Sequence, residues 1–406
     1  MSVWDDLVGQ HRAAEALREA AAGHGMSHAW LFTGPPGSGR SNAAVAFAAA
    51  LQCERGRDSG PADGGRASVP GVETSGSAEV GCGVCHACHT VLAGSHADVK
   101  RVSTEGLSLG VDFIRDLVRA SALTPVGRGW QVIIVEDADR LTERAVNALL
   151  KAIEEPAVRT VWMLCTPTVE DVLPTIRSRC RLVTLTTPSA ADVAAFLVRA
   201  DGVSDALASY AARASQGHIG RARALARDEG TRNRRREVVS IPVGLTSLGR
   251  SMKAAQRLAE VTKEEADLVT GELDAREKVD LDSAYGVVER GRRPREYAPA
   301  LAHLLKEQKS RAKRRHLDVV DRSLMDLVSV YRDAVALATG APGELVNAEI
   351  RADVEKIAAG STPELNLRRI GWIFEAREQM LEFNVQPALA LESMMVALQA
   401  PDGASA

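Results

Sequence analysis

Aromatic residues are scarce in this sequence: Phe, Trp and Tyr together make up only 4% of its 406 residues. No apolar run approaches the roughly 18 residues that a membrane-spanning helix needs, so the sequence predicts no membrane span. The N-terminal residues 1–6 place no basic segment before an apolar core, and we therefore expect no secretory signal and a cytoplasmic protein. The net charge of −3 argues against a protein that coats nucleic acid unaided, although a local basic face stays open.

Cysteine is rare as well, with six residues, and in a cytoplasmic protein these are better explained as metal ligands or buried thiols than as disulfides. The rest of the composition is ordinary, with 45% apolar and 25% charged residues, as in globular domains. The length is enough for two or three domains. Because aromatics are few, the cores must be aliphatic and rich in alanine, which favours helices.

A glycine-rich loop follows the apolar run 29–33 and precedes an alanine-rich stretch that should be helical. Strand, glycine loop and helix form the context of a phosphate-binding loop, whose backbone N–H groups and helix end attract phosphate oxygens. The pattern G-x-x-x-x-G-K-[ST] fits at every fixed position but one, because Arg40 stands where lysine belongs. Arginine keeps the charge, but its planar fork fits the space of an ammonium less well. The candidate nucleotide-binding residues are Gly34, Gly37, Gly39, Arg40 and Ser41, the last as a Mg²⁺ ligand.

Two further positions belong to the same candidate site. A buried strand over 130–135 leads into Glu136 and Asp137, and an apolar strand that ends in two acids is typical of the Mg²⁺-and-water half of a nucleotide site. The usual order is aspartate first and glutamate second, so the order here is reversed; a solvated strand end is the alternative. Thr166 ends the next buried strand, near any ligand at the edge of the sheet.

A cysteine cluster predicts a metal site. Cys82, Cys85 and Cys88 stand at two-residue spacing, and Cys53 would supply a fourth thiolate from across an insertion over 54–81 that is rich in Gly, Ser, Pro and Asp. That insertion has little to bury and predicts a disordered or extended segment. Four protein ligands would make a closed, structural zinc site rather than a catalytic one. A set of free thiols is the alternative, and the rival fourth ligands are His86, His89 and His96.

Basic residues gather at three places. A tight turn after the sheet carries Arg177, Ser178 and Arg179 and suggests an anion contact, with plain surface charge as the alternative. The clusters 232–236 and 313–315 could touch DNA phosphates, although a solvated face explains them as well.

Strands that alternate with helices predict an α/β domain with a parallel sheet over residues 1–186, which includes the zinc module at 53–88. We expect a small helical lid domain over 187–231 and an all-helical C-terminal domain over 232–406. Apolar stripes at helical spacing in the last region, over 317–335 and 370–381, indicate helix packing rather than a cofactor site.

Taken together, these pieces resemble the clamp-loader AAA+ subunits of bacterial DNA polymerase III, and within that family the delta-prime subunits. The resemblance is specific over residues 1 to about 230, whereas the helical remainder fits the collar domain of the family only by size and helicity. It is carried by the glycine loop, the four-cysteine module and three further stretches, Val8–Gln10, Asn147–Pro156 and Leu173–Cys180.

The resemblance implies a P-loop NTPase-like AAA+ domain in a ring with ATP-hydrolysing gamma or tau subunits and a delta subunit. The ring loads the sliding clamp on primer-template DNA during replication, as part of the DNA polymerase III holoenzyme. Motor subunits of the family carry the loop lysine, an Asp-Glu pair and an arginine that senses nucleotide; this chain has Arg40, Glu136-Asp137 and Gly220 at those places.

The same resemblance implies that Arg179 is an arginine finger that reaches into the ATP site of a neighbouring subunit. We therefore expect a subunit that hydrolyses little or no ATP alone. Binding of ATP and Mg²⁺ at its own site is doubtful. The alternatives are a gamma- or tau-like motor subunit and an autonomous ATPase in which Arg40 replaces lysine.

Overall fold

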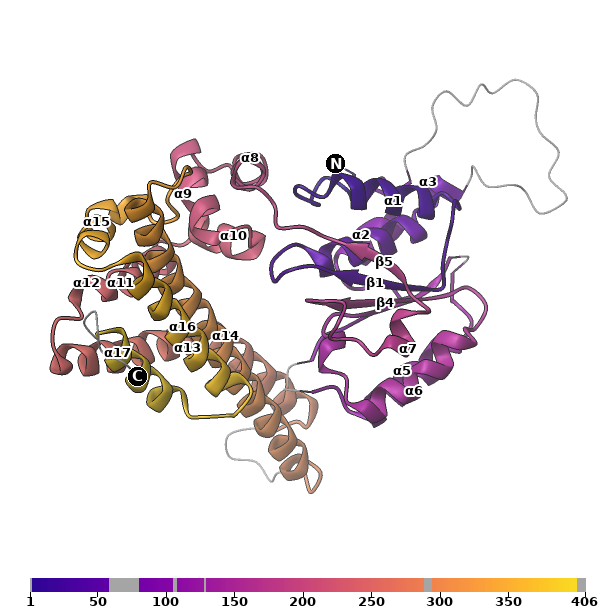
Figure 1. The fold of residues 1–406 in the computed structure, drawn as a ribbon. Coiled ribbons are helices and arrows are strands. Elements are labelled where there is room, and N and C mark those ends of the chain that lie inside the picture. The colour runs from indigo at the N-terminus through magenta and orange to yellow at the C-terminus, as the bar shows by residue number, and fades with distance from the viewer. Residues whose placement is uncertain (1, 58–79, 105–107, 128, 288–293, 400–406) are drawn as a thin grey trace, which may run out of the picture. The chain divides into compact units, whose positions relative to one another are not determined.

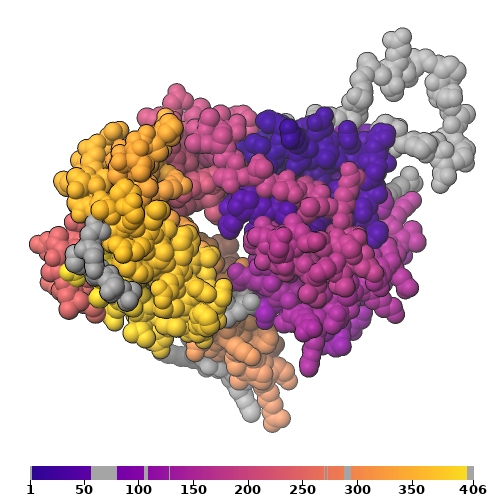
Figure 2. Space-filling view, in the orientation of Figure 1, coloured from indigo at the N-terminus to yellow at the C-terminus, as the bar shows by residue number. Residues whose placement is uncertain are grey.

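The computed structural model describes residues 2–57, 80–104, 108–127, 129–287 and 294–399. The chain divides into two compact units, one that ends at Ala226 and one that begins at Arg227. No helix within the described ranges combines the length and the hydropathy needed to cross a bilayer. The indigo to magenta atoms of the first unit form a continuous packed surface in the space-filling view (Figure 2).

A five-stranded parallel sheet lies at the centre of the first unit, with the strand order β2-β3-β4-β1-β5. The strands are β1 (Ala29–Thr33), β2 (Val99–Val102), β3 (Gln131–Val135), β4 (Thr160–Thr166) and β5 (Arg181–Thr184). The three central strands are buried along their whole length, as expected for a parallel sheet that is covered on both faces.

Helices cover both faces of this sheet (Figure 1). Successive side chains of a strand point to opposite faces, so Trp30 and Phe32 of β1 pack with the layer of α1 and α2, while Ala29 and Leu31 pack with the layer of α5 and α6. The helices around the sheet are α1 (His11–Ala21), α2 (Arg40–Gln52), α3 (Glu54–Arg57), α4 (His86–Leu92), α5 (Val111–Ser121), η1 (Ala138–Arg140), α6 (Glu143–Glu154) and α7 (Pro174–Arg177).

Three short helices follow the sheet within the first unit: α8 (Ala190–Asp201), α9 (Asp205–Ser215) and α10 (Ile219–Arg227). Their apolar residues form a cluster of their own, which Val8 from the N-terminal segment joins. The amide of the neighbouring Gln10 fastens the strand-to-lid connection, because its Nε2 donates to the carbonyl of Thr186 at 2.7 Å and its Oε1 accepts from the Thr186 N–H at 3.1 Å. The Val8–Gln10 stretch is therefore part of the lid's support.

The second unit is all helical in its described residues. Its longest helices, α13 (Leu248–Ala284) and α14 (Tyr297–Thr339), pack against each other, and α14 also packs against α16 (Pro363–Leu381). The remaining elements are α11 (Glu229–Val239), α12 (Ile241–Gly244), η2 (Ala348–Ile350), α15 (Arg351–Ala359) and α17 (Pro387–Leu398). The predicted helical stripes over 317–335 and 370–381 lie in α14 and α16, respectively. Val320, Leu324, Leu327 and Tyr331 of the first and Ile373 of the second belong to the main cluster, whereas Phe374 and Leu381 are exposed.

A buried ionic network explains one residue of the basic cluster 232–236, Arg235. The side chain of Arg235 is only 2% exposed; its Nε lies 3.3 Å from Asp326 Oδ1, and its guanidinium also donates to Asn347 and pairs with Glu349. Asn347 in turn bonds Asp333 through its backbone N–H at 2.8 Å and its side-chain amide at 2.9 Å. Arg235 is therefore a structural residue rather than one exposed to DNA.

The predicted fold class is confirmed: a parallel α/β sheet of the P-loop type with a small helical lid is followed by an all-helical region. Of the insertion over 54–81, the first residues form the short helix α3 (Glu54–Arg57), while 58–79 lie outside the described residues. The contacts divide the chain once, after Ala226, and the division into three domains stays a prediction.

Candidate functional site

The candidate nucleotide residues gather at one edge of the sheet. The glycine loop follows β1, Glu136 and Asp137 follow β3, and Thr166 ends β4, which pairs with both of those strands. Because the strands are parallel, their carboxyl ends meet at the same edge. The register places Thr33, the last residue before the loop, directly beside Thr166. The candidate nucleotide residues thus lie at one edge of the sheet.

The glycines of the loop adopt backbone conformations that other residues rarely take. Gly34, Gly37 and Gly39 have φ values of +153°, +82° and +94°. A Cβ on Gly34 would come within 2.6 Å of the carbonyl oxygen of Leu185, so this position has no room for a side chain. The sequence needs glycine here for the shape of the loop itself, whether or not a phosphate binds.

The lid lies directly on this loop. A Cβ added to Gly37 would come within 2.2 to 2.6 Å of the ring and Cα of His218, which is too close for any real contact. The N–H of Ile219, the first residue of α10, donates to the carbonyl oxygen of Gly37 at 3.4 Å. The face of the loop at Gly37 is therefore occupied by the chain itself.

Arg40 turns back onto its own loop, where its Nη1 donates to the carbonyl oxygen of Gly34. Burial lowers the pKa of Arg40, and the nearby carboxylates of Asp139, Asp137 and Asp171 act in the opposite direction. An arginine head is larger than an ammonium and presents its donors in a fixed plane. The cation of this loop is thus used to hold the loop together.

The acidic pair is also engaged within the domain. Glu136 forms an ion pair with Arg101 of the adjacent strand β2. The carboxylate of Asp137 accepts a hydrogen bond from the backbone N–H of Thr104 at 2.9 Å. Both carboxylates therefore have internal partners with which a Mg²⁺ ion would compete.

Thr166 is fully buried, and its hydroxyl bonds inside the loop that follows it. Its Oγ1 lies 3.1 Å from the carbonyl oxygen of Thr168 and 3.3 Å from Asp171 Oδ2. Ser41 lies half-buried in the first turn of α2.

Sequence reasoning missed the internal partners of this site, which are Arg101, Thr104 and His218. The first two lie on or just after β2, which is short and mostly exposed and carries no motif. His218 lies two residues before Gly220, the position at which the resemblance places the nucleotide-sensing arginine of motor subunits. The glycine at 217 is a signal in the sequence, because glycine is the usual residue where the chain takes a positive φ or packs closely. In the structure its φ is +86°, and a Cβ there would lie 2.3 Å from Thr187.

The four cysteines come together as a second site. The sulfurs of Cys53, Cys82, Cys85 and Cys88 all lie within 4.8 Å of one another. Two thiolates that bind one zinc ion at about 2.3 Å in tetrahedral geometry lie roughly 3.8 Å apart, so sulfurs within 4.8 Å of one another need only small shifts to share one ion. These four residues can hold a metal ion, and none of the three rival histidines belongs to the cluster among the described residues.

The local fold explains why these sulfurs converge. Cys53 directly follows α2, and Cys85 caps α4, which packs against α2. The N–H groups of Cys85 and Cys88 point at the sulfurs of Cys82 and Cys85, at 3.4 and 3.5 Å, as in a metal-binding knuckle. Burial raises the pKa of the Cys88 thiol, so a cation beside it is what would favour the thiolate. The donor set therefore fits a closed zinc site.

Arg179 lies in the turn after α7, far along the sequence from the glycine loop. Its side chain is 40% exposed. Its Nη1 donates to the carbonyl oxygen of Thr175 at 2.8 Å and to the Ser178 hydroxyl at 3.2 Å, and its Nη2 lies 2.8 Å from Glu154 Oε1. The guanidinium is thus held in place yet still open to a partner.

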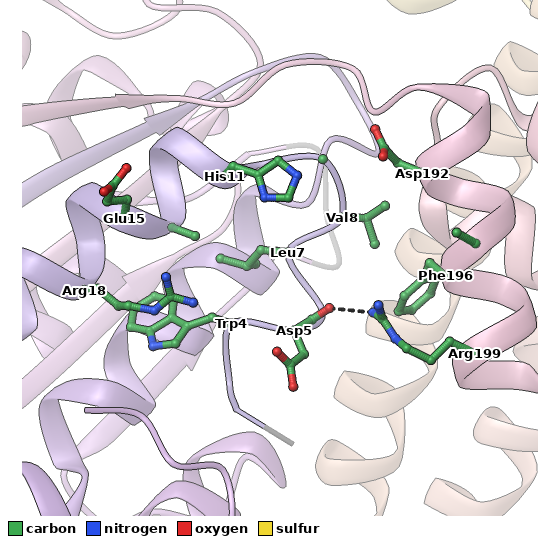
Figure 3. Close-up of a pocket in the computed structure, with 13 residues that line it drawn as sticks. Trp4, Asp5, Leu7, Val8, His11, Glu15, Arg18, Asp192, Phe196 and Arg199 are labelled. Atoms are coloured by element: carbon green, nitrogen blue, oxygen red, sulfur yellow. Dashed lines mark hydrogen bonds between the residues drawn. The ribbon is translucent and has the colours of Figure 1, made fainter. Parts of the chain in front are cut away.

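A separate cavity of about 520 Å³ lies between the N-terminal segment, α1 and α8 (Figure 3). Its apolar part includes Trp4 and Phe196, and its rim carries charged side chains. The Nη2 of Arg199 donates to the carbonyl oxygen of Asp5 at 2.8 Å, and the guanidinium of Arg18 lies 5.6 Å from the centre of the Trp4 ring. No residue of the glycine loop lines this cavity, so it is distinct from the candidate nucleotide site.

Comparison with protein families finds a match over residues 71–189 to the family described as "DNA polymerase III, delta subunit". A second match, over residues 3–57, is to "Magnesium chelatase, subunit ChlI". The chain is 33% identical over 238 residues to the DNA polymerase III subunit delta' of Pseudomonas aeruginosa, which covers 58% of this chain and 65% of that protein.

Other relatives are DNA polymerase III subunits too. The chain is 38% identical over 146 residues to the delta' subunit of Escherichia coli, covering 36% of this chain and 44% of that protein. It is 32% identical over 175 residues to the gamma/tau subunit of Mycobacterium bovis, covering 43% of this chain and 27% of that protein. The chain thus spans less than two thirds of the length of each of these relatives.

Among solved structures, the chain is similar to a DNA polymerase III gamma subunit-related protein of Thermotoga maritima, with 14% identity, a TM-score of 0.41 and coverage of 95% of this chain and 98% of that chain. The family match over residues 71–189 and the delta' relatives, at 33–41% identity, support a member of the clamp-loader subunit family of DNA polymerase III. Because relatives named delta' and relatives named gamma/tau both match, the role within the family is not decided by similarity.

Proposed function

We propose that this chain is a delta-prime subunit of a DNA polymerase III clamp loader. It would sit beside gamma or tau subunits and a delta subunit, in a ring that places the sliding clamp on primer-template DNA. In this proposal the chain is a stator that hydrolyses little or no ATP, and its catalytic contribution is Arg179, which acts on the ATP of a neighbouring subunit.

The observation that carries the proposal is the contrast between the two arginines. Arg40 is bound to the Gly34 carbonyl inside its own loop, whereas Arg179 stands half-exposed on a turn. The internal partners of Glu136 and Asp137 add to this, because nucleotide and Mg²⁺ would have to displace them. An arginine supplied in trans stabilises the charge that develops on a transferred phosphoryl group.

The Arg179→Ala variant, assembled with the other loader subunits, tests the proposal. An arginine finger contributes roughly 10³-fold or more to phosphoryl transfer, so one ATP site should lose its fast turnover while the other sites keep theirs. Single-turnover ATP hydrolysis with primed DNA and clamp measures this as a missing fast phase.

Arg177→Ala is the matched control, because Arg177 is an exposed arginine two residues earlier, at the end of α7, and should leave the fast phase intact. An Arg179→Ala loader with all of its fast phases would contradict the proposal.

We also propose that the four-cysteine cluster holds zinc with a structural role. The site would be closed by four protein ligands, which leaves no open position for a substrate. Bound zinc would supply a cross-link between the end of α2 and the knuckle around α4, and the cysteines themselves would do no chemistry.

A second candidate function, ATP binding by the chain itself, is favoured by one observation. The hydroxyls of Thr33, just before the loop, and of Ser38, within it, are buried with no hydrogen-bond partner among the described residues. Equilibrium titration of the isolated chain with a labelled ATP analogue separates the two functions, because saturable binding that Arg40→Ala abolishes would support a nucleotide-binding subunit.

A further inference from the structure

The ion pair between Arg179 and Glu154 is the starting point. Glu154 is the last residue of α6, and its Oε1 lies 2.8 Å from Nη2 of Arg179. Both side chains are partly exposed, at 46% and 40%, so the pair lies at the surface of the first unit. A surface ion pair of this kind contributes little to the free energy of unfolding, so stability alone does not account for it.

Buried neighbours fix the two partners relative to each other. Ile153 precedes Glu154, Ile176 lies three residues before Arg179, and both isoleucines are fully buried in the same cluster beneath the sheet. The helices α6 and α7 also pack against each other. The backbones that carry the acid and the arginine are therefore held by the core, so the pair has a defined geometry although its tips are exposed.

The pair uses only part of the arginine's capacity. A guanidinium has five N–H donors. Nη1 is directed at Thr175 and Ser178, and one N–H of Nη2 faces Glu154. This arrangement leaves Nε–H and the second Nη2–H for an anion, on a group whose orientation is already set.

We propose that Glu154 is a positioning residue for Arg179, which orients the guanidinium for the ATP of a neighbouring subunit. This inference rests on the proposed function, because it has meaning only if Arg179 acts in trans. A long, flexible side chain loses rotational freedom when it is fixed in one geometry, and a partner that fixes it beforehand removes that loss from the reaction step.

The test uses the assembled loader, with DNA-stimulated ATP hydrolysis as the readout. Glu154→Ala should lower kcat roughly tenfold, which is less than the roughly 100-fold loss from a 1 Å misplacement of a reacting group. The KM for ATP should stay unchanged, since the finger acts on the transferred phosphoryl group rather than on ground-state binding. Glu154→Gln should fall between wild type and Glu154→Ala, because its amide oxygen still accepts a hydrogen bond but carries no charge.

Two comparisons make the result decisive. Glu155→Ala removes the adjacent exposed carboxylate and should behave as wild type. In the Arg179→Ala background, Glu154→Ala should cause no further loss, because a positioning residue acts only through the group that it positions.

The possible results distinguish the positioning role of Glu154 from the proposed action of Arg179 on a neighbouring subunit. If Arg179→Ala lowers the rate but Glu154→Ala leaves it unchanged or raises it, the positioning role is overturned. A further loss in the double variant overturns it too, since Glu154 would then act by another route. If Arg179→Ala itself has no effect, the proposed function fails instead.

Discussion

The two ends of α2 differ in what they keep. At its N-terminal end, the glycine loop retains the shape of a phosphate site, but Arg40 and His218 use that site internally. At its C-terminal end, Cys53 joins three other cysteines, and the four sulfurs lie within 4.8 Å of one another. One helix thus connects a glycine loop whose arginine is bound within the chain with four cysteines that are close enough together to hold a metal ion. Inherited architecture and retained binding must therefore be judged from the contacts of each site, because the motif alone does not separate them.

The largest effect should come from the cysteine end. Structural zinc binds zinc-finger peptides with roughly 10–16 kcal/mol, and some of that free energy, on the order of several kcal/mol, should stabilise this domain. Cys88→Ser should lose the metal and lower the free energy of unfolding in urea, and a chelator should do the same to the wild-type chain. Cys180→Ser is the control, because Cys180 lies outside the cluster. A metal content well below one per chain in protein never exposed to chelator would remove this half of the comparison.

An intermediate effect should come from the lid contact. Gly37→Ala places a methyl group against His218, and overpacking of this kind typically costs about 1–3 kcal/mol. Gly23→Ala is the matched control, because Gly23 also has a positive φ, +96°, but nothing lies within 4 Å of its added Cβ. Both variants share the backbone strain, so the difference between their unfolding free energies isolates the steric contact. Equal losses would mean that the lid does not rest on the loop in solution.

The smallest effect is expected from the substitution that restores the motif. Arg40→Lys returns the consensus lysine, but Glu136 remains paired with Arg101 and Gly37 remains covered by His218. We expect no saturable binding of an ATP analogue by the isolated variant below about 1 mM. Binding in the micromolar range would show that Arg40 alone prevents nucleotide binding. The difference between the two ends of α2 would then depend on one residue.

Much of the fold could be predicted because its signals are local. The strand, glycine loop and helix over 29–52 follow from apolar runs, glycines and alanines that lie next to one another in the sequence. The parallel sheet follows from the alternation of strands and helices. The boundaries of the C-terminal helices were less accessible: the stripe over 317–335 indicates a helix, but not that it begins as early as Tyr297.

The site was predicted only as a set of residues. That Arg40, Glu136 and Thr166 share one edge follows from strand order, and the structure brings them together. How each is satisfied depends on partners from elsewhere in the chain, as with Glu136 and Arg101, which are 35 residues apart. Such pairings leave no periodicity or spacing to read. The roles assigned to these residues, and to Arg179, remain predictions for the experiments above.

The ionic network around Arg235 has a consequence for how the helical unit comes apart. Arg235 joins α11 to Asp326 on α14 and to Asn347 and Glu349 just beyond it, across 91, 112 and 114 residues of chain. A buried guanidinium left with only some of its partners is strongly unfavourable. If any one of these segments opened, the buried guanidinium would lose part of its hydrogen bonds and ion pairs. We therefore expect these separate stretches of the helical unit to unfold together, as a single cooperative element.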